Sequence, residues 1–145
     1  MPVTWDYVLD SSAVVAYLFD EPGADRVEPI LGKRGAISAV NFAEVLKTIL
    51  FEATDPSANL SGAFTALGIP IVHFEAEQAE TAADLWGETR GLNLGLGDRA
   101  CLALALRSGR PVMTADQEWR KLPASLGIKV EIIREVKATR RLTKG

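Results

Sequence analysis

The stretch YVLDSSAVVAYLF, residues 7–19, sets the pattern of the fold, because a short apolar strand runs directly into an apolar helix. We expect the strand at residues 7–9, ending at Asp10, and the helix at residues 12–19, which Glu21-Pro22-Gly23 stops. A strand followed at once by a helix is the start of an alternating α/β pattern.

The same alternation continues along the rest of the chain. Further strands are expected at residues 35–38, 69–74, 111–114 and 129–133, and further helices at 24–31, 41–52, 57–67, 75–89, 98–108 and 116–122. In the helix at 41–52, an apolar stripe repeats at helical spacing through Phe42, Val45, Leu46, Ile49 and Leu50. The pattern predicts an α/β fold in one domain, with a central, mostly parallel sheet and helices on both faces. Ligands of such sheets bind at the carboxyl ends of the strands.

Composition indicates an ordinary globular domain and excludes several kinds of site. The chain has 145 residues, of which 48% are hydrophobic and 24% charged. One cysteine, Cys101, allows neither an intrachain disulfide nor a cysteine zinc site, and one histidine, His73, gives little basis for a histidine metal site or a Ser-His-Asp triad. We see no signal peptide, and the longest apolar run, residues 100–106, is too short to cross a bilayer. A cytoplasmic protein without membrane contact is expected.

Charge is unevenly distributed. The chain carries a net charge of −3, but residues 134–145 hold five cations against one acid, so the remainder is strongly acidic. We therefore divide the chain into a domain at residues 1–133 and a basic tail at residues 134–145, in which Arg140 and Arg141 either contact the phosphates of a polyanionic partner or are simply solvated. An acidic body is not typical of a nucleic-acid binder, so a polyanion would have to be held locally, with the help of cations.

Three aspartates stand where a pure scaffold does not need them. Asp10 follows the first strand, Asp116 follows the strand at 111–114, and Asp98 opens a helix that is otherwise almost wholly apolar. Each one alone is also compatible with an ordinary helix N-cap, and Thr114 competes for the last of these caps. Because the carboxyl ends of parallel strands meet at one edge, Asp10 and Asp116 are expected to be neighbours.

Glu44 has two interpretations. On a helical wheel it lies opposite the apolar stripe and near Lys47, which is typical of a solvated glutamate. Asn41 occupies the same side one turn earlier, so this face is equally compatible with the lining of a polar cleft. The sequence leaves both interpretations open.

Taken together, the acids indicate a metal site. Several carboxylates in one cleft repel one another and raise each other's pKa unless a cation neutralises them. An all-oxygen set suits a hard ion such as Mg²⁺ or Mn²⁺ rather than zinc. Such an ion activates water and polarises a phosphoryl oxygen, so the residues predict an acidic metal site with phosphoryl-transfer chemistry.

Four segments resemble the PIN-domain family, and specifically the VapC-type toxins of VapBC toxin–antitoxin systems. They are VLDSSA at residues 8–13, ISAVNFAEV at 37–45, LGDRACLALA at 96–105 and VMTADQEW at 112–119. Each segment is weak alone, but all four occur in order and at the spacing of the family. The likeness extends over nearly the whole chain, from Val8 to about Ile133.

The resemblance implies a metal-dependent endoribonuclease. It implies Mg²⁺ (or Mn²⁺) bound mainly through Asp10 and Asp98, with Glu44 and Asp116 contributing directly or through water. Hydroxyl and amide groups beside the acids would orient them, and these belong to Ser12, Asn41 and Thr114. Arg99 follows Asp98 directly, and it is expected either to reach a substrate phosphate or to extend to solvent or pair with an acid.

The resemblance also implies partners: an RNA substrate, a cognate VapB-type antitoxin, a second copy in a homodimer, and operator DNA only through the antitoxin. The main alternative is a PIN-fold binding or regulatory module that acts within an antitoxin–DNA complex. Two other α/β classes are disfavoured because the chain lacks their signatures. A receiver-like or phosphatase domain would need a phosphoacceptor Asp after a central strand and a late Lys, and a dinucleotide-binding domain would need Gly-x-Gly-x-x-Gly after the first strand. Trp5, Trp86 and Trp119 are expected to be packing residues rather than an RNA-stacking platform.

Overall fold

The computed structural model describes residues 3–54 and 59–135, and its centre is a parallel sheet. The five strands lie in the order β3-β2-β1-β4-β5, and every neighbouring pair is parallel. Their bounds are Tyr7–Leu9 for β1, Gly35–Ser38 for β2, Ile71–Val72 for β3, Val112–Thr114 for β4 and Val130–Ile132 for β5. The α/β prediction is confirmed, and the sheet is parallel throughout.

The sheet order creates a switch point between β1 and β4. The chain builds outward from β1 through β2 to β3, and then crosses to the other side of β1 to add β4 and β5. Val8 of β1 pairs with Ala36 of β2 on one side and Val112 of β4 on the other. Ligands of open α/β sheets bind where the strand order reverses, so a site is expected beyond the carboxyl ends of β1 and β4.

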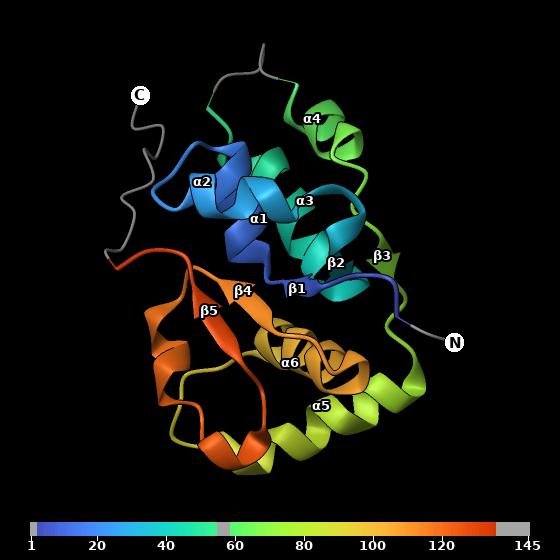
Figure 1. Cartoon of the computed structure of the whole chain (residues 1–145), viewed down its shortest axis with the longest axis vertical. Coiled ribbons are helices and arrows are strands. Elements are labelled where there is room, and N and C mark those ends of the chain that lie inside the picture. The colour runs from blue at the N-terminus through green and yellow to red at the C-terminus, as the bar shows by residue number, and fades with distance from the viewer. Residues whose placement is uncertain (1–2, 55–58, 136–145) are drawn as a thin grey trace.

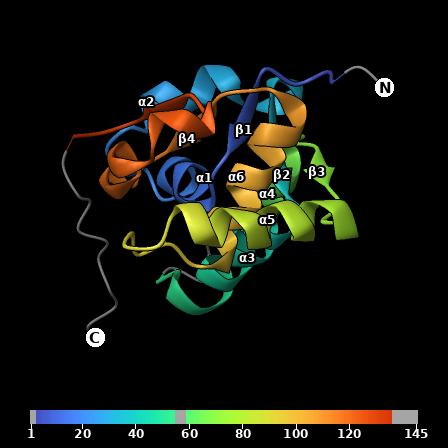
Figure 2. The same ribbon diagram turned by 90° about the horizontal axis from the view of Figure 1, so that it is seen from below.

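Helices cover both faces of the sheet, as predicted (Figure 1). One layer contains α1 (Ser11–Leu18), α2 (Ala24–Val27), α3 (Ala39–Glu52) and α4 (Leu60–Ala66), and the other contains α5 (Ala76–Glu88) and α6 (Leu96–Ser108). Figure 2 shows α5 lying along the outside of α6, which itself packs on β1, β2 and β4. Two buried apolar clusters follow from this layering, one on each face.

Several boundaries differ from those expected, and each difference has a local cause. Helix α6 begins two residues before Asp98, because Gly95 serves as its N-cap, and it ends at Gly109, whose φ of 66° suits glycine. Strand β3 is shorter than the apolar run predicted. The expected helix after Asp116 is a 3₁₀ helix, Gln117–Lys121, and the second helix likewise ends in a 3₁₀ turn at Glu28–Ile30.

Helix α3 does not bury the stripe that its apolar residues suggest. Its buried residues are Asn41, Val45, Thr48 and Ile49, whereas Leu50 is 68% exposed. The buried face is therefore rotated from the predicted one toward the polar residues. Part of the reason is that Asn41 is drawn inward by hydrogen bonds described below, so a polar contact sets the helix orientation together with the apolar core.

The expectations about membrane contact and about the basic tail concern the rest of the chain. Among residues 3–54 and 59–135, no helix has the length and apolar character needed to cross a membrane. Residues 136–145, which hold most of the basic tail including Arg140 and Arg141, lie outside the described residues.

Candidate active site

Asp10 follows β1 and precedes α1, yet its carboxylate does not cap the helix. Its Oδ2 atom accepts hydrogen bonds from Ser12 Oγ at 2.6 Å and from Thr114 Oγ1 at 2.8 Å. Asp10 is only 3% exposed, and the described residues give no hydrogen bond to its Oδ1 atom. Asp10 is thus the N-cap residue of α1 by position, but its side chain makes no capping hydrogen bond: two hydroxyls orient one oxygen, and the other remains available to a ligand.

Both hydroxyls are themselves held in place by backbone N–H groups. Ser12 Oγ accepts from the N–H of Ala115 at 2.9 Å, and Thr114 Oγ1 accepts from the N–H of Asp116 at 3.1 Å. A hydroxyl has a single proton, so each of these side chains directs its own proton to Asp10. The segment after β4 thus positions the carboxylate at the end of β1, as expected for Ser12 and Thr114.

The environment of Asp10 disfavours its charged form. Burial away from water is the largest cause and raises the pKa of Asp10 to about 7 from its ordinary value of 3.8. The negative charges of Asp98 and Glu44 raise the pKa further, whereas the Ser12 and Thr114 hydroxyls oppose this change by stabilising the carboxylate. In this arrangement a proton or another cation is needed to neutralise Asp10 near neutral pH.

Glu44 is half-buried and is held by hydrogen bonds from two neighbouring side chains, so it is not a simple solvated glutamate. Its Oε1 atom accepts hydrogen bonds from Ser11 Oγ at 2.9 Å and from Asn41 Nδ2 at 2.9 Å. Asn41 is fully buried, and its Nδ2 also donates to the carbonyl oxygen of Gly97 at 2.9 Å. Asn41 therefore connects α3 to the start of α6 while it orients the carboxylate of Glu44.

Gly97 is a site residue that the sequence reasoning did not identify. A Cβ atom added at Gly97 would overlap the carboxylate of Glu44. Any larger residue at this position would displace the Glu44 carboxylate from the place that Ser11 and Asn41 give it. The signal in the sequence is the Gly-x-Gly run at residues 95–97, directly before Asp98. Ser11 was also missed, although it stands between Asp10 and Ser12.

Asp98 lies in the first turn of α6 rather than at its N-cap. Its Oδ2 atom accepts a hydrogen bond from the N–H of Gly95 at 3.0 Å, so it contributes to capping without being the N-cap residue. Burial is the largest cause that raises the pKa of Asp98, and the charges of Glu44 and Asp116 add to it. The Gly95 N–H and the charge of Arg99 act in the opposite direction.

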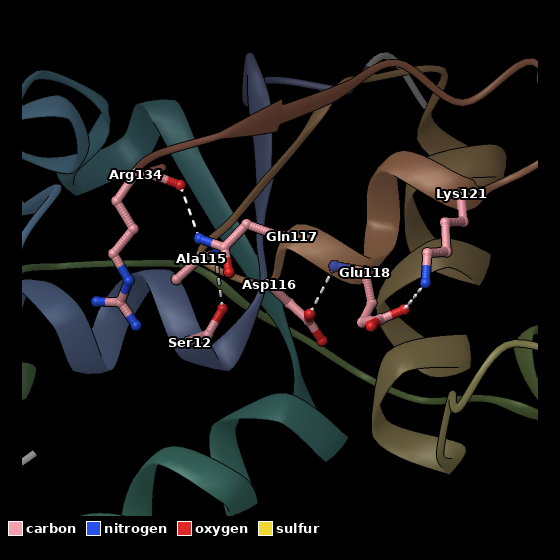
Figure 3. Close-up of a pocket in the computed structure, with 7 residues that line it drawn as sticks. All are labelled: Ser12, Ala115, Asp116, Gln117, Glu118, Lys121 and Arg134. Carbon is pink, nitrogen blue, oxygen red and sulfur yellow. Dashed lines mark hydrogen bonds and ion pairs between the residues drawn. The ribbon is translucent and has the colours of Figure 1, made fainter. Parts of the chain in front are cut away.

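Asp116 is the N-cap of the 3₁₀ helix, because its Oδ1 atom accepts from the N–H of Glu118 at 2.9 Å. It also faces a pocket of about 510 Å³, shown in Figure 3. The pocket lies beside Ser12 and brings two cations near the acids, but Arg134 is paired with buried Glu21 at 3.2 Å and Lys121 with Glu118 at 3.0 Å. The remaining lining residues are Ala115 and Gln117.

The four acids thus form one electrostatic cluster at the switch point. The charges of Asp98 and Glu44 raise the pKa of Asp10, and the charges of Glu44 and Asp116 raise the pKa of Asp98. Within the described part of the chain, no group of three Asp, Glu, His or Cys side chains is already arranged to coordinate a metal ion. The donor chemistry nevertheless fits a hard divalent cation, since every donor is a carboxylate oxygen and burial and mutual repulsion raise two of the pKa values. A bound cation would relieve that repulsion and allow the acids to approach.

The side chain of Arg99 is half-buried, and one of its nitrogens is held by the backbone. Its Nη1 atom donates to the carbonyl oxygen of Leu94 at 3.1 Å, and its Nε atom is buried without a partner. The ion pairs formed by the described residues do not include Arg99. Its side chain lies against the loop before α6, beside a second pocket considered below.

The comparisons with known proteins identify the class. The family model of the PIN domain matches residues 7–124, and the chain belongs to the PIN domain family. Comparison with curated protein sequences gives no match.

Solved structures of the same fold include toxin–antitoxin complexes. A toxin–antitoxin complex from Klebsiella pneumoniae contains a chain with a TM-score of 0.69 at 18% identity, covering 90% of this chain and 99% of that one. VapBC2 from Rickettsia felis, bound to a DNA fragment from its promoter, gives 0.68 at 19% identity, covering 87% and 97%. VapBC-5 from Mycobacterium tuberculosis gives 0.61 at 24% identity, covering 90% and 99%.

Proposed function

We propose that this protein is a metal-dependent endoribonuclease and acts as the toxin of a type II toxin–antitoxin pair. The observation that carries the proposal is the cluster of Asp10, Glu44, Asp98 and Asp116 at the switch point of the sheet, with a buried Asp10 whose pKa is raised to about 7. A scaffold gains nothing from carboxylates that destabilise one another, whereas a cation-dependent enzyme requires them. The fold shared with VapBC complexes supports the toxin role.

In the proposed mechanism, Asp10 and Asp98 hold Mg²⁺ (or Mn²⁺), and Glu44 and Asp116 contribute directly or through water. When bound, the ion supplies Lewis-acid activation of water and neutralises charge on the phosphate. The protein's own residues orient the acids: Ser12 and Thr114 fix Asp10, and Asn41 and Ser11 fix Glu44. A carboxylate of this acid cluster that keeps its negative charge would accept the proton that the attacking water loses.

The partners follow from the same relationship. We propose neutralisation by a cognate VapB-type antitoxin, a homodimeric toxin, and contact with operator DNA through the antitoxin. The Rickettsia felis relative is a VapBC pair bound to a DNA fragment from its promoter, which supports this arrangement. We place the activity in the cytoplasm, in a domain formed by residues 1–133 followed by the basic tail at residues 134–145.

The test is RNA cleavage by the purified protein without antitoxin, in Mg²⁺ or Mn²⁺ and in EDTA. We expect cleavage that depends on the metal and is lost in Asp98→Asn. Asp84→Asn is the matched control, because Asp84 is an exposed aspartate on α5 outside the cluster. Equal cleavage by wild type and Asp98→Asn would contradict the mechanism. No cleavage of any RNA by a folded, metal-loaded protein would instead favour the PIN-fold binding or regulatory module.

A further inference from the structure

A second pocket lies between the C-terminal end of α5 and the loop that leads into α6. Its volume is about 300 Å³, and it is lined by Trp86, Thr89, Arg90, Gly91, Leu92, Leu94 and Arg99. This volume is at the lower end of the range for small-ligand sites, so it suits one flat group rather than a long segment.

Trp86 is the first unusual feature of this pocket. Its indole is 53% exposed, whereas Trp119 is only 1% exposed, so Trp86 is not the packing residue that the sequence suggested. The guanidinium carbon of Arg90 lies 5.5 Å from the centre of the Trp86 ring, within the range of a cation–π contact. The guanidinium group lies over the indole ring, so the exposed remainder of the ring, together with the guanidinium plane, is the surface on which a nucleobase can stack.

The two arginines are the second feature. Arg90 and Arg99 take part in none of the ion pairs formed within residues 3–54 and 59–135, and no acidic side chain lines the pocket. The Nε atom of Arg99 is buried without a partner, while its Nη1 atom is held by the carbonyl oxygen of Leu94. In a chain with a net charge of −3, two cations line one pocket that has no acidic lining residue, and this local positive charge favours an anion.

The location of the pocket links it to the acid cluster. Arg99 is adjacent to Asp98 in the first turn of α6, and its charge acts on the Asp98 carboxylate. The loop at residues 91–95 connects the end of α5 that lines the pocket to the helix that carries Asp98. A strand of nucleic acid that passed the acid cluster would therefore meet Trp86 and the two arginines within a short length of chain.

We propose that this pocket holds one unpaired base of an RNA strand and the phosphate beside it, next to the bond that the acid cluster cuts. Trp86 stacks on the base, and Arg90 and Arg99 contact the phosphate. The inference rests on the proposed ribonuclease function, which it extends by assigning a substrate form. Stacking tolerates any base, so the pocket selects single-stranded RNA rather than a particular sequence.

The experiment measures binding without cleavage, using a labelled single-stranded RNA oligonucleotide in EDTA. Trp86→Ala is expected to weaken binding by roughly fivefold or more, and Trp86→Phe to retain most of it. Arg90→Ala is expected to reduce the magnitude of the slope of log K against log salt by about 0.7, the value of one lost phosphate contact on a single strand. Arg107→Ala is the matched control, because Arg107 lies at the other end of α6, where it pairs with Glu77.

The outcomes separate this inference from the proposed function. If RNA binding depends on Trp86 but the protein cuts no RNA, the proposal of a base-binding pocket stands and the proposed ribonuclease function fails. Metal-dependent cleavage with unchanged binding and KM in Trp86→Ala would retain the nuclease and overturn the pocket. Equal losses in Arg90→Ala and Arg107→Ala would also overturn it, since they would reflect overall charge. Duplex RNA that binds as tightly as the single strand would overturn the assignment of single-stranded RNA as the substrate. Iodide quenching of Trp86 fluorescence is a further check: an indole that iodide cannot reach, because a second copy of the chain covers it, would also overturn the proposal.

Discussion

Replacing Asp10 by asparagine should make the metal-free protein more stable while removing its activity. The folded protein holds Asp10 at a pKa of about 7, against 3.8 for an ordinary aspartate. Between these two pH values the folded state binds a proton that the unfolded state has released, so stability falls as pH rises through this window. Asparagine has no charge to bury and escapes this loss.

The size of the effect follows from the same two values. Each pKa unit corresponds to about 1.4 kcal/mol, so ionised Asp10 costs the folded state about 4 kcal/mol at pH 8. At pH 5 the folded carboxyl is already protonated, and the cost falls to about 2 kcal/mol. The advantage of Asp10→Asn is therefore expected to shrink by about 2 kcal/mol between pH 8 and pH 5.

Urea unfolding in EDTA at both pH values measures this difference. Asp84→Asn, at an exposed position, should leave stability nearly unchanged at either pH. Mg²⁺ should stabilise the wild type and leave Asp10→Asn almost unaffected, because the ion replaces the missing proton. The reasoning is refuted if Asp10→Asn is no more stable than the wild type at pH 8, or if its advantage is the same at both pH values.

Three further substitutions test separate parts of the site. Gly97→Ala would place a methyl group against the carboxylate of Glu44. We expect this variant to remain folded by circular dichroism but to cleave RNA at least about tenfold more slowly. A wild-type cleavage rate would contradict the close approach of Gly97 to Glu44. Thr114→Val removes a hydroxyl that stabilises ionised Asp10, so the acidic limb of the pH–rate profile should move to higher pH, and an unmoved or lowered limb would contradict this. Arg134→Ala removes the ion pair with buried Glu21 and should lower the free energy of unfolding in urea, whereas an unchanged free energy of unfolding would mean that the pair is unimportant.

Much of the fold could be predicted because its signals are local. Strand β1 and the start of α1 follow from an apolar triplet, a polar break and a second apolar run, and the end of α6 follows from Gly109. The parallel arrangement follows from the alternation of strands and helices, since a helix between two strands returns the chain to the same end of the sheet. The placement of Asp10 and Asp116 near one edge is a consequence of that topology.

The rest depends on contacts between distant segments, which local patterns do not encode. Asn41 is buried because it bonds to both Glu44 and Gly97, and the apolar stripe of α3 alone predicted a different face. The capping interpretation of Asp10 was wrong because the hydroxyl of Thr114, far along the chain, competes successfully for its carboxylate. Trp86 was expected to be a core or surface-packing residue, and the sequence does not show that it is half-exposed and lies under the guanidinium group of Arg90.

The central claim is that the four acids together bind one kind of cation, and Mn²⁺ binding tests it most directly. Calorimetric or spin-resonance titration of Mn²⁺ would be compared among wild type, Asp10→Asn, Glu44→Gln, Asp98→Asn and Asp116→Asn, with Asp84→Asn as the control. We expect the affinity to fall by at least about tenfold in Asp10→Asn and Asp98→Asn, by less in Glu44→Gln and Asp116→Asn, and not at all in the control. Unchanged Mn²⁺ affinity in Asp10→Asn and Asp98→Asn would contradict the claim.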